Sequence, residues 1–180
     1  MAGRAWLWMG VTVVGALLAA PPLEAHGPTR QKVTETVDIN APADKVWAAI
    51  GNFQDMSWHP AIAKTEGSGG NDKDAKRTLT LKQGGTIAEA LTKYDAAGKS
   101  LSYEILAVDV KVLPVSNYSS TLSVEDKGGK SVVEWRGAFY RGYLNNDPPP
   151  ELSDEAAVKA IKGVYRSGLD ALKAKLEAGG

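Results

Sequence analysis

Apolar and polar residues alternate with a period of two along much of the chain, which is typical of β-strands that bury one face. The pattern begins at residues 32–39, where Val33, Val37 and Ile39 share one parity and polar residues fill the other. Turn-forming clusters separate five further runs, at residues 77–82, 86–94, 100–107, 117–125 and 131–140. This spacing predicts an antiparallel meander, in a sheet of about six to seven strands.

Two other segments carry apolar residues at the spacing of an α-helix. Over residues 42–53 they recur every three or four positions, which predicts a short amphipathic helix after the first strand. A longer helix is predicted to begin at Ser153, a residue type that caps helix N-termini, and its apolar stripe consists of Val158, Ile161, Tyr165, Leu169, Leu172 and Leu176. Because such a stripe must be buried, we expect this C-terminal helix to pack on the sheet in an α+β fold.

This order of elements resembles a known fold. The segments INAPADKVW (residues 39–47), NF (52–53) and WHP (58–60) are similar to the opening of the SRPBCC superfamily of START-like and Bet v 1-like proteins. The resemblance covers residues 33–178 and implies the helix-grip fold, a curved antiparallel sheet wrapped around a long C-terminal helix, often with an apolar cavity between them. The superfamily includes lipid carriers, cyclases and hydrolases, so the fold alone does not identify the function.

The first 25 residues differ from the rest in composition. Arg4 supplies a short positive region, residues 5–20 are uncharged and largely apolar, and small residues lead to Ala25. We therefore expect residues 1–25 to be a cleaved signal peptide, 26–32 an N-terminal tail and 33–178 a single SRPBCC-like domain. The apolar run is shorter than the roughly 20 residues that span a bilayer, which favours export to the bacterial periplasm without a stable membrane anchor after cleavage. An uncleaved anchor is the alternative.

Composition excludes several classes of function. The chain has no cysteine and only two histidines, so disulfides, thiol nucleophiles, c-type haem attachment and a three-histidine zinc site are impossible. Its 21 Lys and Arg residues balance 21 Asp and Glu residues, which argues against nucleic-acid binding through a broad basic surface. We expect no cofactor and no metal site. One alternative is a copper site, in which His26, if exposed by cleavage after Ala25, would chelate through its amine and imidazole with help from His59.

Three further segments resemble a narrower family. They are HGPTRQKV (residues 26–33), DVKVLPVSNY (109–118) and GAFYRGYLNNDPPP (137–150), which look like the MxaD family of periplasmic accessory proteins of methanol oxidation. The resemblance implies a non-enzymatic protein that promotes the interaction of a PQQ-dependent methanol dehydrogenase with its electron acceptor, cytochrome cL. The lack of a haem attachment site agrees with a partner that carries no redox centre of its own.

Eight residues are candidates to line a ligand cavity: Glu35, Trp58, His59, Glu89, Tyr103, Tyr118, Trp135 and Phe139. The aromatic members suit an apolar pocket with polar tips, and they suit a packed core equally well. Glu35 and Glu89 lie on apolar parities, and with His59 they could perform acid–base chemistry on a carbonyl or hydroxyl compound. The simpler interpretation is a structural His59 bonded to a backbone carbonyl, with Glu89 in a cross-strand ion pair with Arg77.

The segment at residues 139–150 has the composition of a protein interface. Its candidate contact residues are Tyr140, Arg141, Tyr143, Asn145, Asn146, Asp147, Pro148, Pro149 and Pro150. The three prolines lack backbone donors and favour a stiff extended conformation, so docking would cost little conformational entropy. The segment could also be a rigid connector that aims the C-terminal helix at the sheet, and the two roles are compatible.

Three functions therefore remain after the sequence analysis. The first is the accessory role in methanol oxidation. The second is a carrier or sensor of a small apolar ligand held between the sheet and the C-terminal helix. The third is a cyclase-like or dehydratase-like enzyme that uses His59 with Glu35 or Glu89.

Overall fold

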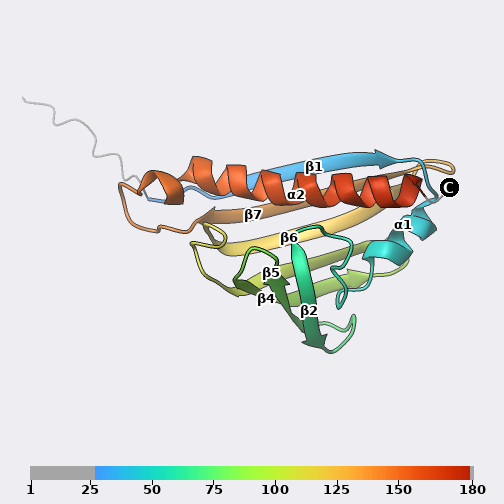
Figure 1. Cartoon of the computed structure of the whole chain (residues 1–180), viewed down its shortest axis with the longest axis horizontal. Helices are drawn as coiled ribbons and strands as arrows, with labels where there is room; N and C mark the ends of the chain where they lie inside the picture. Colours follow the sequence, from blue (N-terminus) through green and yellow to red (C-terminus); the bar gives the residue numbers. More distant parts are fainter. Residues whose placement is uncertain (1–26, 179–180) are drawn as a thin grey trace, which may run out of the picture.

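The computed structural model describes residues 27–178, which form one seven-stranded antiparallel sheet and two α-helices. In chain order the elements are β1 (Gln31–Ile39), α1 (Ala43–Ile50), β2 (Ile62–Ser68), β3 (Lys76–Leu81), β4 (Thr86–Asp95), β5 (Ser100–Val108), β6 (Val115–Asp126), β7 (Ser131–Arg141), the short 3₁₀ helix η1 (Pro150–Leu152) and α2 (Asp154–Glu177). The strand order in the sheet is β1-β7-β6-β5-β4-β3-β2. The sheet curves around the long C-terminal helix (Figure 1), which confirms the predicted helix-grip fold.

The predicted signal peptide and His26 lie outside the described residues. Strand β1 pairs with β7 from Gln31 onward, so residues 31 and 32 belong to the sheet and not to the predicted tail. Across residues 27–178, no helix is long and apolar enough to cross a membrane. No group of three His, Asp or Glu side chains within this range is placed to hold a metal ion.

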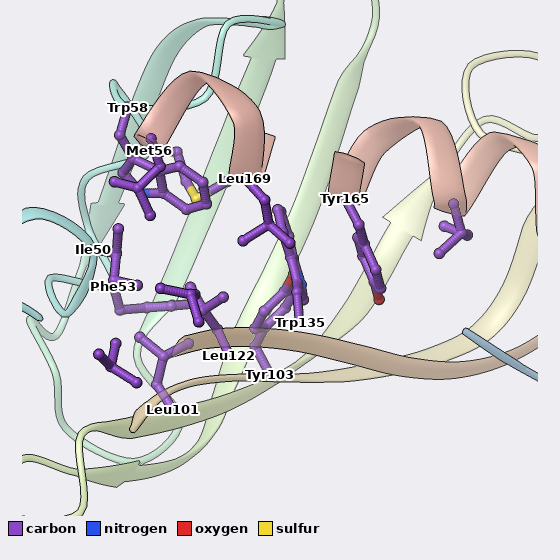
Figure 2. Packing of buried hydrophobic residues seen from close by; sticks show 14 of the residues in the cluster. Ile50, Phe53, Met56, Trp58, Leu101, Tyr103, Leu122, Trp135, Tyr165 and Leu169 are labelled. Carbon is purple, nitrogen blue, oxygen red and sulfur yellow. The ribbon is translucent and has the colours of Figure 1, made fainter. Parts of the chain in front are cut away.

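Helix α2 forms where the sequence predicts it and lies along β1 and β7 (Figure 1). The Ser153 side chain caps its N-terminus by accepting a hydrogen bond from the backbone N–H of Ala156 at 3.2 Å. Its buried face contains Ala157, Ile161, Tyr165, Gly168, Leu169, Leu172 and Leu176. In Figure 2, Tyr165 and Leu169 point from α2 towards Trp135 on β7, and the rings of Trp135 and Tyr165 stack with centroids 4.4 Å apart. The α2 stripe and the concave face of the sheet therefore form one core.

Two elements differ from the prediction. Helix α1 ends at Ile50 instead of continuing to Phe53. The backbone N–H of Phe53 donates to the Asn71 side chain at 2.8 Å and so does not continue the helical hydrogen bonds. Strand β2 was not predicted as a separate strand. It lies at the edge of the sheet and is exposed along most of its length, so its sequence has no apolar alternation to detect.

Candidate functional site

A cavity of about 110 Å³ lies between the sheet and α2 and is partly open to solvent. Its apolar wall consists of Met56, Ala61, Ile62, Leu79, Leu81, Ile87, Ile105, Val112, Leu113, Ile161 and Val164. Five of the eight predicted cavity residues also line it: His59, Glu89, Tyr103, Tyr118 and Trp135. The cavity is therefore apolar with a small set of polar groups, as is typical of sites for small molecules.

His59 follows α1 in a loop that returns to the sheet, and both of its ring nitrogens bond to the backbone. Nε2 lies 3.0 Å from the carbonyl oxygen of Val164 on α2, and the N–H of Ala61 donates to Nδ1 at 3.2 Å. Since Nδ1 accepts, the proton must be on Nε2 and the imidazole is neutral. Burial lowers the pKa of His59, which favours this neutral form. His59 thus acts as a link between the loop and α2.

Gly168 allows α2 to approach this histidine. A Cβ atom at position 168 would lie 2.5 Å from Cδ2 of His59 and 3.0 Å from the Trp135 ring. Any larger residue would push the helix away from the loop or the sheet. The glycine therefore sets the distance between α2 and this end of the cavity.

Arg77 and Glu89 occupy directly opposite positions on β3 and β4. The Arg77 Nε donates to Oε2 of Glu89 at 2.6 Å, and Nη1 donates to the Phe53 carbonyl at 2.7 Å. Both side chains are almost fully buried, with exposed fractions of 3% for Arg77 and 5% for Glu89. The predicted cross-strand ion pair is confirmed. Burial raises the pKa of Glu89, and the Arg77 charge opposes that shift.

A buried network of hydroxyl groups lies beside the cavity. The Trp135 Nε1–H is shared between the Tyr103 hydroxyl at 3.1 Å and Ser120 Oγ at 3.0 Å. The Tyr165 hydroxyl bonds to the Tyr118 hydroxyl at 2.6 Å and to Ser120 Oγ at 3.1 Å. Burial raises the pKa of Tyr103 to about 12 and also raises the pKa of Tyr118 and of Tyr165. All three phenols are therefore neutral at physiological pH.

Two members of this network were not predicted as site residues. Ser120 shares the buried parity of Leu122 and Val124 on β6, so a polar residue on that parity was a usable signal. Tyr165 was assigned to core packing, and its hydroxyl contact depends on Gly137, where a Cβ atom would collide with the Tyr165 oxygen. The glycine in β7 was the signal for that close approach.

The other three predicted cavity residues lie outside the cavity wall. Glu35 is directed to α2, where its Oε2 is 3.4 Å from Nη1 of Arg166. Trp58 packs on Trp135 with ring centroids 5.6 Å apart, and Phe139 stacks on Tyr118 at 6.1 Å. Glu35 therefore does not join Glu89 and His59 on the cavity, which corrects the prediction of Glu35 as a cavity residue.

Arg141 is the clearest correction in the predicted interface segment. Its side chain is only 5% exposed and is held by internal contacts. Nε donates to the Tyr143 carbonyl at 2.7 Å, Nη2 donates to the Asn145 carbonyl at 2.9 Å, and Nη1 donates to Oδ2 of Asp154 at 3.0 Å. Arg141 thus fixes the connector to the start of α2 and offers no charge to a partner.

The remaining residues of the segment lie on or near the surface. Asn145, Asn146, Asp147 and Pro150 are exposed, and Tyr140, Tyr143, Pro148 and Pro149 are half-buried. Leu144 was not singled out from the sequence, yet 57% of it is exposed. Arg30 covers one face of Tyr140, with its guanidinium carbon 5.5 Å from the ring centroid. The segment therefore combines an internal anchor with an exposed apolar side chain.

Both the sequence and the structure are similar to those of known proteins. Residues 30–177 match the model of the family described as "Polyketide cyclase / dehydrase and lipid transport". MLP-like protein 423 of Arabidopsis thaliana is 28% identical over 138 residues, which are 71% of this chain and 87% of that protein. The structure of protein XoxI from Bacillus cereus is similar, with a TM-score of 0.68 and 30% identity over 81% of this chain and 94% of that one.

The fold is also shared with a more distant protein. Norcoclaurine synthase from Thalictrum flavum, whose structure contains dopamine and hydroxybenzaldehyde, superposes with a TM-score of 0.63 at 14% identity, covering 94% of this chain and 97% of that one. At this identity the likeness concerns the fold alone. The match over residues 30–177 and the shared helix-grip architecture together show that the chain belongs to the polyketide cyclase/dehydrase and lipid transport family, within the SRPBCC-like, Bet v 1-like proteins.

Proposed function

We propose that the protein is a non-enzymatic binding protein that holds a small apolar molecule between its sheet and α2. The observation that supports this most directly is the cavity of about 110 Å³, whose wall is mainly apolar. An engineered apolar cavity of about 150 Å³ holds benzene, and this cavity is smaller but partly open to solvent, so it suits a molecule of about that size at most. The ligand is therefore a compact molecule, with a single ring or a short chain, and not a long lipid.

The arrangement of the polar groups favours binding over catalysis. Both nitrogens of His59 bond to the backbone, and Glu89 is paired with Arg77. Glu35, the other carboxylate considered for acid–base chemistry, pairs with Arg166 away from the cavity. A general acid or base must reach the proton that it transfers. The proposed role therefore requires the ligand to be held and released without reaction.

Native mass spectrometry of protein purified from its own host tests this proposal. We expect a retained small molecule in the wild type and its loss in Ile105→Trp, because Ile105 lines the cavity and the larger side chain would fill it. Leu106→Trp is the matched control, since Leu106 is adjacent in sequence but is 49% exposed and does not line the cavity. If the wild type carries no small molecule and takes up none from a panel of small apolar probes, the proposal is wrong.

A second candidate function follows from the resemblance to the MxaD family. In this role the protein is exported to the periplasm and promotes the interaction of a PQQ-dependent methanol dehydrogenase with cytochrome cL. The exposed Leu144, in the segment whose sequence carries the resemblance, supports a contact with another protein. The neighbouring Asn145, Asn146 and Asp147 would form a polar rim around this contact.

Cross-linking to a purified dehydrogenase and cytochrome cL from the same host tests the second function. We expect capture by the wild type and weaker capture by Leu144→Asp, which places a charge at the centre of the proposed contact. Leu106→Asp is the control, because Leu106 is the other exposed large apolar residue of the described chain and lies on β5. Equal capture of the two variants would exclude the Leu144 surface, and no capture of the wild type would exclude this function.

A further inference from the structure

One polar atom of the cavity wall has no partner in the fold. Oε2 of Glu89 accepts the hydrogen bond from Arg77, whereas Oε1 bonds to no residue within 27–178. Glu89 lines the cavity, and its Oε1 is not fully enclosed by protein atoms. This carboxylate oxygen is therefore open to whatever occupies the cavity.

The position of this oxygen is fixed in advance by the groups behind it. Arg77 is held by the Phe53 carbonyl, and its guanidinium carbon lies 4.1 Å from the ring centroid of Phe53 and 5.1 Å from that of Tyr103. Glu89 in turn is held by Arg77 at 2.6 Å. A bound group would meet an acceptor that needs no rearrangement, and such preorganisation favours binding.

We infer that the cavity selects a small neutral molecule with a hydroxyl group, an alcohol or a phenol, whose O–H donates to Oε1 of Glu89. This inference rests on the proposed binding function and names the class of ligand. The hydrocarbon part of the molecule packs against the apolar wall formed by Leu79, Ile87 and Ile105. A molecule without a donor would cover this oxygen and leave it unpaired, which costs free energy.

The charges around the cavity favour a neutral donor over a cation. Arg77 already neutralises Glu89, and His59 is held in its neutral form by the Ala61 N–H. A buried ammonium group would bring an additional charge next to a carboxylate that Arg77 already neutralises, and desolvation of that charge is costly. Ketones and carboxylates are also disfavoured, because they only accept hydrogen bonds and cannot donate one to Oε1 of Glu89.

Phenol and toluene form a matched pair of probes, because they differ only in a hydroxyl in place of a methyl group. NMR titration of the ligand-free mature chain should show phenol binding about tenfold or more tighter than toluene, as expected for a hydrogen bond to a charged group. Equal affinities would overturn the inference and leave the binding function intact. Failure of both probes to bind would also overturn the inference, whereas the proposed function is overturned only if native mass spectrometry and the wider probe panel show no ligand either.

A double variant tests the role of Glu89 without leaving a buried charge. Arg77→Met with Glu89→Leu replaces the ion pair by apolar side chains of similar size, an exchange that proteins often tolerate. With the fold checked by near-UV circular dichroism, we expect this variant to lose the preference for phenol and to bind toluene at least as well as the wild type does. Glu35→Gln, which changes a carboxylate outside the cavity wall, should keep the preference. A preference for phenol that survives in the folded double variant would refute the assignment.

Discussion

Arg77 and Arg141 are both almost completely buried, but they stabilise different kinds of structure. Arg77 lies on β3, between the edge strand β2 and β4, and pairs with Glu89, a carboxylate that is itself only 5% exposed. Arg141 lies at the end of β7 and pairs with Asp154, which is 24% exposed, while it also binds two carbonyls of the connector. The first arginine positions a side chain on the cavity, and the second positions a length of backbone. A buried cation can thus serve either a binding site or a loop, depending on what it holds.

The largest predicted effect is the loss of one partner from the Arg77–Glu89 pair. Glu89→Leu would leave the Arg77 charge buried and uncompensated, so we expect the free energy of unfolding to fall by about 3–5 kcal/mol. Urea denaturation followed by tryptophan fluorescence measures this change. The double variant Arg77→Met with Glu89→Leu should recover most of the loss, because no unpaired charge remains. A single variant as stable as the wild type would contradict the proposed energetics of the pair.

Replacement of Arg141 is predicted to have a smaller and more local effect on stability. Arg141→Met should lower the free energy of unfolding by about 2 kcal/mol, since the Asp154 side chain that loses its partner is 24% exposed, unlike Arg77 and Glu89. Hydrogen exchange should accelerate in residues 142–150 more than in the strands. Arg141→Lys should not rescue the connector, because an ammonium group cannot match three acceptors around a planar guanidinium. Uniform acceleration throughout the chain would show that Arg141 supports the whole fold instead.

The sequence pattern predicted the partner of Arg77 but not the partners of Arg141, for a physical reason. Strand parity places Arg77 and Glu89 on the same buried face, so their pairing follows from the register of an antiparallel sheet. Arg141 also shares the parity of Trp135 and Phe139, which was a usable signal of burial. Its carbonyl partners, however, depend on the path of the connector, and local sequence does not determine that path. The composition of the segment suggested an exposed interface instead.

The same distinction applies to the site as a whole. The strands and α2 could be predicted because each carries a long periodic pattern, whereas β2 could not because it is an exposed edge strand. Cavity residues such as Tyr103 and Trp135 could be named from parity. The volume of the cavity and the free oxygen of Glu89 could not, because both depend on how closely α2 packs against the sheet.

Two glycines of α2 test how tightly the cavity side of the molecule is packed. Gly168→Ala should destabilise the protein by about 1–3 kcal/mol, because the new methyl group would meet His59 and Trp135. Gly163→Ala is the control, since a Cβ atom there would meet nothing within 4 Å. It should be neutral or stabilise the helix by up to about 1 kcal/mol. Thermal unfolding of both variants makes the comparison, and equal effects would show that close packing at Gly168 is not required.

The smallest effect is expected in the pH dependence, where two buried groups of the cavity act in opposite directions. Burial lowers the pKa of His59 below its ordinary value of 6.5, so just below pH 6.5 the unfolded chain holds a proton that the folded chain does not. The stability that His59 contributes therefore falls as the pH drops through 6.5. Burial raises the pKa of Glu89 above 4.5, so the folded chain keeps that proton longer, and its contribution falls as the pH rises from 4.5.

Urea unfolding of variants between pH 5 and 7.5 separates the contributions of His59 and Glu89 to the pH dependence of stability. His59→Gln keeps a donor and an acceptor but cannot titrate, so its stability should decline less on acidification than that of the wild type. The double variant Arg77→Met with Glu89→Leu lacks the opposing group, so its stability should decline more than that of the wild type. Parallel pH profiles for all three proteins would show that neither group changes its protonation on unfolding.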